Sequence, residues 1–152
     1  MLVMKRINNR IMTGIYLIIS IALFSSSVMA NENSDVKIAV DIGDQVMIVT
    51  LEDNPTARDF LSLLPLTLTL NDYGNAEKNS EGLPKALSEE DAPESDSGST
   101  GDLVYYAPWR NIAFFHGQGG VFRGVIKIGT ITSGESIINK KGPLTATISV
   151  VK

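Results

Sequence analysis

Apolar and polar residues alternate with a period of two through much of the chain after residue 35, which is the pattern of strands buried on one face. The alternation predicts strands over residues 36–42, 66–70 and 125–131. Apolar and β-branched runs predict further strands over residues 46–51, 103–107 and 112–115, and a final strand is predicted over residues 144–151. A turn at Gly43 joins the first two strands as a hairpin. Many short strands without an alternating strand and helix rhythm indicate a mainly β fold, either a barrel or a sandwich.

One helix interrupts the strand pattern between residues 54 and 65. Asn54 is a good capping residue, and Pro55 suits the first helical position because no hydrogen bond is lost there. The predicted buried face of this helix is formed by Phe60, Leu61 and Leu64. Pro65 is expected to end it. A second short helix or turn is predicted over residues 133–139.

Residues 72–102 have a different composition, rich in Gly, Pro, Ser, Asn and acids. The pattern predicts one long acidic loop, solvated and mobile, because loops of this length are either functional or disordered. Three of its residues are apolar enough to dock on the rest of the domain: Leu83, Ala86 and Leu87.

The first thirty residues have the layout of a cleaved secretory signal. Lys5, Arg6 and Arg10 precede an apolar run over residues 11–24, and small residues lead up to Ala30. The apolar run is shorter than the roughly 20 residues of a membrane-spanning helix, so cleavage is favoured over a retained anchor. We therefore predict an exported protein, periplasmic or secreted, whose single domain is residues 31–152 and which has no membrane contact after cleavage.

Charge and composition exclude several classes of function. The net charge is −4, and no basic stripe is present, which disfavours a nucleic-acid partner. The absence of cysteine excludes disulfides and thiol chemistry. A single histidine cannot build a typical zinc site, and the acids lack calcium-loop spacing, so neither a metal nor a cofactor is expected.

The candidate ligand-binding residues lie between residues 106 and 116 and in the glycine-rich link that follows. Around the Pro108 corner, Trp109 and Arg110 could meet a ligand by stacking or by pairing with a carboxylate, although ordinary packing and solvation explain them as well. One member of each adjacent aromatic pair on the flanking strands should face inward. The full candidate set is Tyr106, Trp109, Arg110, Phe115, His116 and Arg123. No catalytic residue can be assigned.

Several motifs resemble the small bacterial cyclophilin-like fold proteins. They are N-P-T-A-R at residues 54–58, L-P-L-T-L-T at 64–69 and G-D-x-x-Y-Y-A-P-W at 101–109, within a match that spans about residues 36–150. The resemblance implies a closed cyclophilin-like β-barrel with one or two short helices, one of which covers an open end. The resemblance does not imply any particular biochemical activity.

Enzymatic isomerisation of proline bonds is the alternative that this resemblance raises. True cyclophilins carry a catalytic Arg on the strand after the first helix, where this chain has Thr67 and Thr69. Arg110 and Arg123 are the candidates for a displaced catalytic cation. The missing Arg favours a monomeric, non-catalytic module that binds a peptide or a small molecule, with a peptidyl-prolyl isomerase as the alternative.

Overall fold

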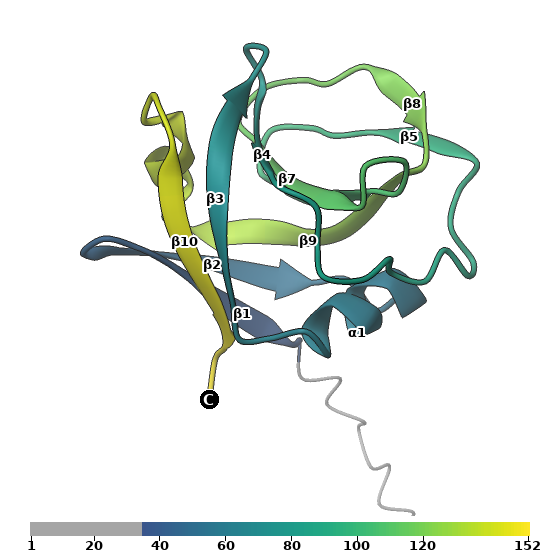
Figure 1. The fold of residues 1–152 in the computed structure, drawn as a ribbon, viewed down its shortest axis with the longest axis horizontal. Coiled ribbons are helices and arrows are strands. Elements are labelled where there is room, and N and C mark those ends of the chain that lie inside the picture. Colours follow the sequence, from purple (N-terminus) through teal and green to yellow (C-terminus); the bar gives the residue numbers. More distant parts are fainter. Residues whose placement is uncertain (1–34) are drawn as a thin grey trace, which may run out of the picture. The chain divides into compact units, whose positions relative to one another are not determined.

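The computed structural model describes residues 35–152, and the predicted signal segment lies outside these described residues. Eight antiparallel strands close into a barrel in the order β1-β10-β3-β4-β7-β6-β9-β2, and β5 pairs with β8 in a separate two-stranded sheet. Figure 1 shows this barrel, with α1 at one end and β5 and β8 outside its wall. The barrel strands are β1 (Lys37–Ile42), β2 (Gln45–Leu51), β3 (Leu66–Tyr73), β4 (Glu77–Ser80), β6 (Asp102–Tyr106), β7 (Asn111–Phe115), β9 (Val125–Ser133) and β10 (Leu144–Val150). The remaining elements are α1 (Pro55–Leu61), β5 (Ser95–Ser97), β8 (Val121–Arg123) and the 3-10 helix η1 (Glu135–Asn139).

The prediction of a mainly β, closed barrel with one or two short helices is confirmed. Alternate strand residues point inward and form one continuous core, because successive side chains of a strand lie on opposite faces. The predicted hairpin is present, with β1 and β2 paired from Lys37–Thr50 to Ile42–Gln45. Among residues 35–152, no helix combines the length and the apolar character needed to cross a membrane.

Helix α1 begins as its sequence predicts. The Asn54 side chain accepts a hydrogen bond from the Ala57 amide at 2.8 Å, and Pro55 is the first helical residue. Phe60 is completely buried against the barrel core. The helix ends at Leu61, four residues before Pro65, so Pro65 does not itself end the helix.

The prediction of one long loop over residues 72–102 is wrong in its extent. Strand β3 continues to Tyr73, β4 occupies Glu77–Ser80 and β5 occupies Ser95–Ser97. Strand β4 contains no apolar residue, and its sequence therefore resembles a loop. The backbone hydrogen bonds of its neighbours β3 and β7 make it a barrel strand all the same.

Residues 81–94 have no regular structure, yet several contacts fasten them to α1 and to the barrel. Leu83 and Leu87 are buried, as predicted, whereas Ala86 is exposed. Asp59 of α1 accepts hydrogen bonds from the Ser88 amide and from the Lys85 ammonium, both at 2.9 Å. These bonds lower the pKa of the Asp59 carboxyl, with the Lys85 bond contributing most. The Asp59 side chain of α1 thus fastens residues 85–88, which lie almost thirty positions later in the sequence, to the helix.

Strand β4 also places a lysine inside the barrel. Lys78 is completely buried, and its ammonium donates to Asp72 Oδ1 and to the Gly142 carbonyl, each at 2.7 Å. A second oxygen of Asp72 accepts from the Gly142 amide at 2.7 Å. The Lys78 bond and then the Gly142 bond lower the pKa of the Asp72 carboxyl. Because side chains alternate along a strand, Lys78 points inward while its neighbours Glu77 and Asn79 point outward.

Candidate functional site

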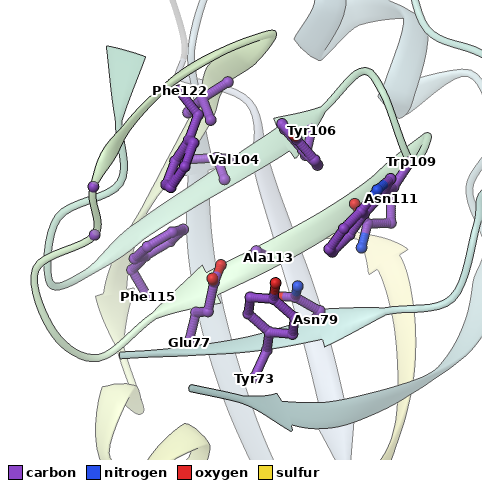
Figure 2. A pocket seen from close by; sticks show the side chains of 13 residues that line it. Tyr73, Glu77, Asn79, Val104, Tyr106, Trp109, Asn111, Ala113, Phe115 and Phe122 are labelled. Carbon is purple, nitrogen blue, oxygen red and sulfur yellow. The ribbon is translucent and has the colours of Figure 1, made fainter. Parts of the chain in front are cut away.

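A pocket lies on the outer face of the barrel, where β3, β4, β6 and β7 run side by side (Figure 2). Its volume is about 240 Å³. The base consists of a small apolar cluster separate from the barrel interior, made by Val104, Ala113, Phe115 and Val125. This volume falls below the roughly 300–1,000 Å³ of pockets for drug-sized ligands, so the pocket suits a compact group.

Strand alternation explains why these residues meet on the outside. Phe114 points into the barrel core, while Phe115 belongs to the outer cluster. In the same way Tyr105 is buried in the barrel and Tyr106 lines the pocket. The prediction that one residue of each aromatic pair faces inward is confirmed, and the second member of each pair forms part of the pocket.

Aromatic rings form most of the pocket wall. Trp109 meets Tyr73 edge-on at a centroid distance of 5.6 Å and Tyr106 at 5.3 Å. Phe122 of β8 lines the pocket from the opposite side (Figure 2). Tyr73, Trp109 and Phe122 are each about half exposed, at 49%, 52% and 59%. Such exposed aromatic area gathered at one concave site is typical of ligand-binding surfaces.

The Phe115 ring packs closely against the backbone of two glycines, Gly98 and Gly119. A Cβ atom built on Gly98 would lie 2.3 Å from Phe115 Cε2, and one built on Gly119 would lie 2.5 Å from Phe115 Cε1. The Gly119 amide donates to the Gly98 carbonyl at 2.8 Å, which joins the two segments across the ring. Only residues without a side chain leave room for the ring between them.

Replacing Gly98 with Ala should therefore displace the Phe115 ring and deform the pocket. Gly98 does not have a left-handed backbone conformation, so the effect is one of space rather than of backbone strain. Overpacking of this kind costs about 1–3 kcal/mol. Chemical denaturation checks the loss of stability. Gly82→Ala is the matched control, because Gly82 also lacks a left-handed backbone and its Cβ would meet only the Trp109 carbonyl oxygen at an ordinary 3.6 Å. A shift of the Phe115 ring signals that is no larger in Gly98→Ala than in the control would contradict the packing argument.

The polar part of the pocket comes from β4 and β7. Glu77 and Asn79 line it from β4, and Asn111 lines it from β7. In Figure 2 the Glu77 carboxylate points into the space that the aromatic rings surround. Within residues 35–152, no lysine, arginine or histidine lines this pocket.

Burial raises the pKa of the Glu77 carboxyl above its ordinary value, and it is the single resolved cause of that shift. The other titratable groups that line the described pocket are the phenols of Tyr73 and Tyr106. The nearest basic residue on β4, Lys78, points into the barrel. Nothing in residues 35–152 thus compensates the desolvation of the Glu77 carboxylate.

A raised carboxyl pKa in the folded state means that ionised Glu77 destabilises the fold. The protonated carboxyl is the favourable form in the fold. The stability of the folded state relative to that with ionised Glu77 is therefore fully present below the unfolded-state pKa and is lost as the pH rises through the folded-state pKa. Glu77→Gln should therefore raise the melting temperature near pH 7.5 and leave it unchanged near pH 3.5, where the carboxyl is protonated in both states. Thermal unfolding at both values checks this. A stability loss at the higher pH would contradict the assignment of Glu77 as an uncompensated charge.

Two asparagine oxygens are left without partners. Asn79 Oδ1 and Asn111 Oδ1 are buried and accept no hydrogen bond from residues 35–152. The orientation of the Asn111 amide is fixed, since its Nδ2 donates to the Ser80 carbonyl at 3.1 Å. Asn111 is only 5% exposed. Unsatisfied buried acceptors are uncommon in folded proteins and point to a missing partner.

The structure divides the candidate residues into two groups. Tyr106, Trp109 and Phe115 line the pocket, whereas Arg110, His116 and Arg123 do not. Arg110 is exposed in the turn before β7 with a positive φ of 52°, and Arg123 is exposed and pairs with Glu94 at 3.0 Å. The His116 amide donates to the Ala76 carbonyl at 2.8 Å, which joins the residue after β7 to the residue before β4.

Sequence reasoning missed the other aromatic and polar side chains of the pocket: Tyr73, Glu77, Asn79, Asn111 and Phe122. The first three follow the expected strand over residues 66–70, in the segment assigned to the loop. The signal that marks them is Gly74, which adopts a positive φ of 57° in the turn between β3 and β4. A turn there continues β3 outward and returns β4 beside it, so that Tyr73 pairs with Glu77.

Metal binding finds no support in residues 35–152, which contain no group of three or more acidic, histidine or cysteine side chains able to hold an ion. The predicted absence of cofactors remains a prediction.

Three comparisons relate the chain to known proteins. The model of the cyclophilin-like family matches residues 40–149. The solution structure of a hypothetical protein from Archaeoglobus fulgidus has a similar fold, with a TM-score of 0.59 and 18% sequence identity over 81% of this chain and 100% of that chain. A search of curated proteins finds no match. At this identity the archaeal structure supports the fold alone.

Proposed function

The chain belongs to the cyclophilin-like family, and we propose that it is an exported, non-catalytic binding module for a small molecule or a short peptide segment. The observation behind the proposal is that the aromatic pocket on the outer barrel face combines exposed rings with two amide oxygens that have no partner among residues 35–152. Filling this pocket would remove the exposed rings from water, and about 25 cal/mol per Å² of apolar area is the usual gain.

The composition of the pocket argues for binding rather than for proline isomerisation. An isomerase of the cyclophilin type needs a cation to stabilise the twisted amide by hydrogen bonding. Neither Arg110 nor Arg123 lines the described pocket, and its one ionisable carboxyl, Glu77, has the opposite charge. The isomerase alternative thus lacks a catalytic cation among the described residues that line this pocket.

A paired experiment tests the binding module. The purified protein is titrated with a panel of small molecules and short proline-containing and lysine-containing peptides, and a proline-isomerisation assay is run beside it with Arg110→Ala and Arg123→Ala. We expect at least one class of ligand to perturb the pocket residues and no isomerisation above background. Isomerisation that disappears in either arginine variant would overturn the non-catalytic assignment.

The proposal places the protein outside the cytoplasm as a monomer, without a nucleic-acid partner. Its support is the signal-like segment at residues 1–30 and the acidic composition. Cell fractionation together with determination of the mature N-terminus tests export, for which a start at Asn31 is the expected result.

A further inference from the structure

The pocket differs from a general apolar cleft, because the charged group that lines it is a carboxylate and two of its amide oxygens have no hydrogen-bond partner among residues 35–152. Glu77 contributes a carboxylate, and Asn79 and Asn111 contribute oxygens without partners. A carboxylate accepts hydrogen bonds and cannot donate them. Among residues 35–152, no positive side chain lines the pocket to balance this charge.

The arrangement of the aromatic rings also favours a positively charged ligand. Tyr73, Tyr106 and Trp109 form one edge-on cluster beside Asn111, and Phe115 lies near Glu77 on the paired strand. The face of an aromatic ring carries partial negative charge and attracts cations, with tryptophan the strongest. A carboxylate among several rings is therefore favourable for a positive group and unfavourable for an anion.

The size of the cavity limits the ligand to a compact group. A volume of about 240 Å³ accommodates a short stem with a polar head, such as one amino-acid side chain. The apolar base of Val104, Ala113 and Val125 suits an alkyl stem, and the polar residues of β4 and β7 suit the head.

We propose that the pocket binds an organic cation bearing N–H groups, an alkylammonium or guanidinium head on a short apolar stem, with Glu77 as its counter-ion. The inference rests on the proposed function of this pocket as a binding site. The head group pairs with the Glu77 carboxylate and lies against the ring cluster. Its N–H groups supply a donor to Asn79, whose Oδ1 atom is shielded from water in the free protein and turns toward the head on binding. The Asn111 amide keeps its hydrogen bond to the Ser80 carbonyl. A free amine and a lysine or arginine side chain of a peptide offer the same chemistry.

The first arm of the test uses ligands of one shape and different charge. The probes are n-butylammonium, its N-trimethylated form, n-butanol and butyrate, titrated into the purified protein near pH 7.5. Trp109 is the only tryptophan of the chain, and its fluorescence reports directly on the pocket. We expect n-butylammonium to bind at least tenfold more tightly than butanol and butyrate, and more tightly than the trimethylated form, which has no N–H donor.

The second arm removes the charge of the pocket without changing its shape. Glu77→Gln should weaken n-butylammonium binding roughly tenfold or more, because a charge-assisted hydrogen bond becomes a neutral one. Glu135→Gln removes the same charge from an exposed acid of η1, outside the pocket, and should leave the affinity unchanged. Equal losses in both variants would show a general charge effect and overturn the role of Glu77.

The outcomes separate this inference from the proposed function. Butanol or butyrate binding as tightly as n-butylammonium would overturn the cation inference and leave a binding module. Equal binding of the trimethylated form would overturn the donor role of the head group. Absence of any Trp109 response across the wider ligand panel would overturn both. N-acetyl-lysine-N-methylamide binding more tightly than n-butylammonium would support a peptide source, and the reverse order a free amine.

Discussion

Trp109→Ala should weaken n-butylammonium binding about thirtyfold, the largest effect that we expect from a single wall residue of the pocket. The substitution removes the ring at the centre of the Tyr73–Trp109–Tyr106 cluster and a preferred surface for a cation. Central aromatic residues of binding sites commonly contribute about 2 kcal/mol or more, which corresponds to this factor. Isothermal titration calorimetry measures the change without relying on tryptophan fluorescence.

Two further variants show whether the effect belongs to the ring. Trp109→Phe keeps an aromatic wall with a weaker attraction for cations and should lie between the wild type and Trp109→Ala. Arg110→Ala changes the next residue, which is exposed and outside the pocket, and should leave the affinity unchanged. An affinity for Trp109→Ala within about twofold of the wild type would contradict the assignment of this wall as the binding surface.

Asp72→Ala should cause the largest loss of stability, because it leaves the buried Lys78 ammonium with the Gly142 carbonyl as its one remaining acceptor among the described residues. Asp72 is itself exposed, but the Lys78 ammonium is completely buried, so removal of the carboxylate leaves that ammonium without its counter-charge, which is far worse than removing both charges. Lys78→Met should cost less, since it removes the charge and fills similar space. The double variant Asp72→Ala with Lys78→Met should recover most of the stability that Asp72→Ala loses.

Denaturation of these three variants at several pH values tests the ion pair. The pKa of Asp72 is lowered in the fold, so the pair contributes stability above the unfolded-state pKa and loses it as the pH falls through the folded-state pKa. Wild type should lose this part of its stability in acid, and Lys78→Met should lose less of it. Additive effects of the two single substitutions in the double variant would contradict a direct coupling.

The sequence predicts the barrel well where strands have one buried face. Strands such as β3 and β10 alternate apolar and polar residues, and helix α1 has a cap and an N-terminal proline, so local pattern and tertiary structure agree. Strand β4 escapes prediction because its sequence, EKNS, has no apolar residue. Its inward positions hold Lys78 and Ser80, which are buried with polar partners instead of apolar ones.

The candidate site could be predicted only in part, because some of its residues lie on β4, a strand without an apolar pattern. Tyr106, Trp109 and Phe115 stand out as aromatic residues around a turn, and the structure brings them to one pocket. Glu77 and Asn79 are ordinary polar residues within an acidic segment, and only the pairing of β4 with β3 and β7 gives them a pocket to face. Charge makes Arg110 and Arg123 candidates in the sequence, but both side chains lie outside the pocket, one in the turn before β7 and the other on β8.

The most direct measurement of the central claim is a fluorescence titration of Trp109 in the wild-type protein with n-butylammonium and with n-butanol. The account predicts saturable binding of the ammonium at a concentration at least tenfold below that of the alcohol, and loss of this preference in Glu77→Gln. Equal responses to the two ligands in the wild type, or a preference that survives in Glu77→Gln, would contradict it.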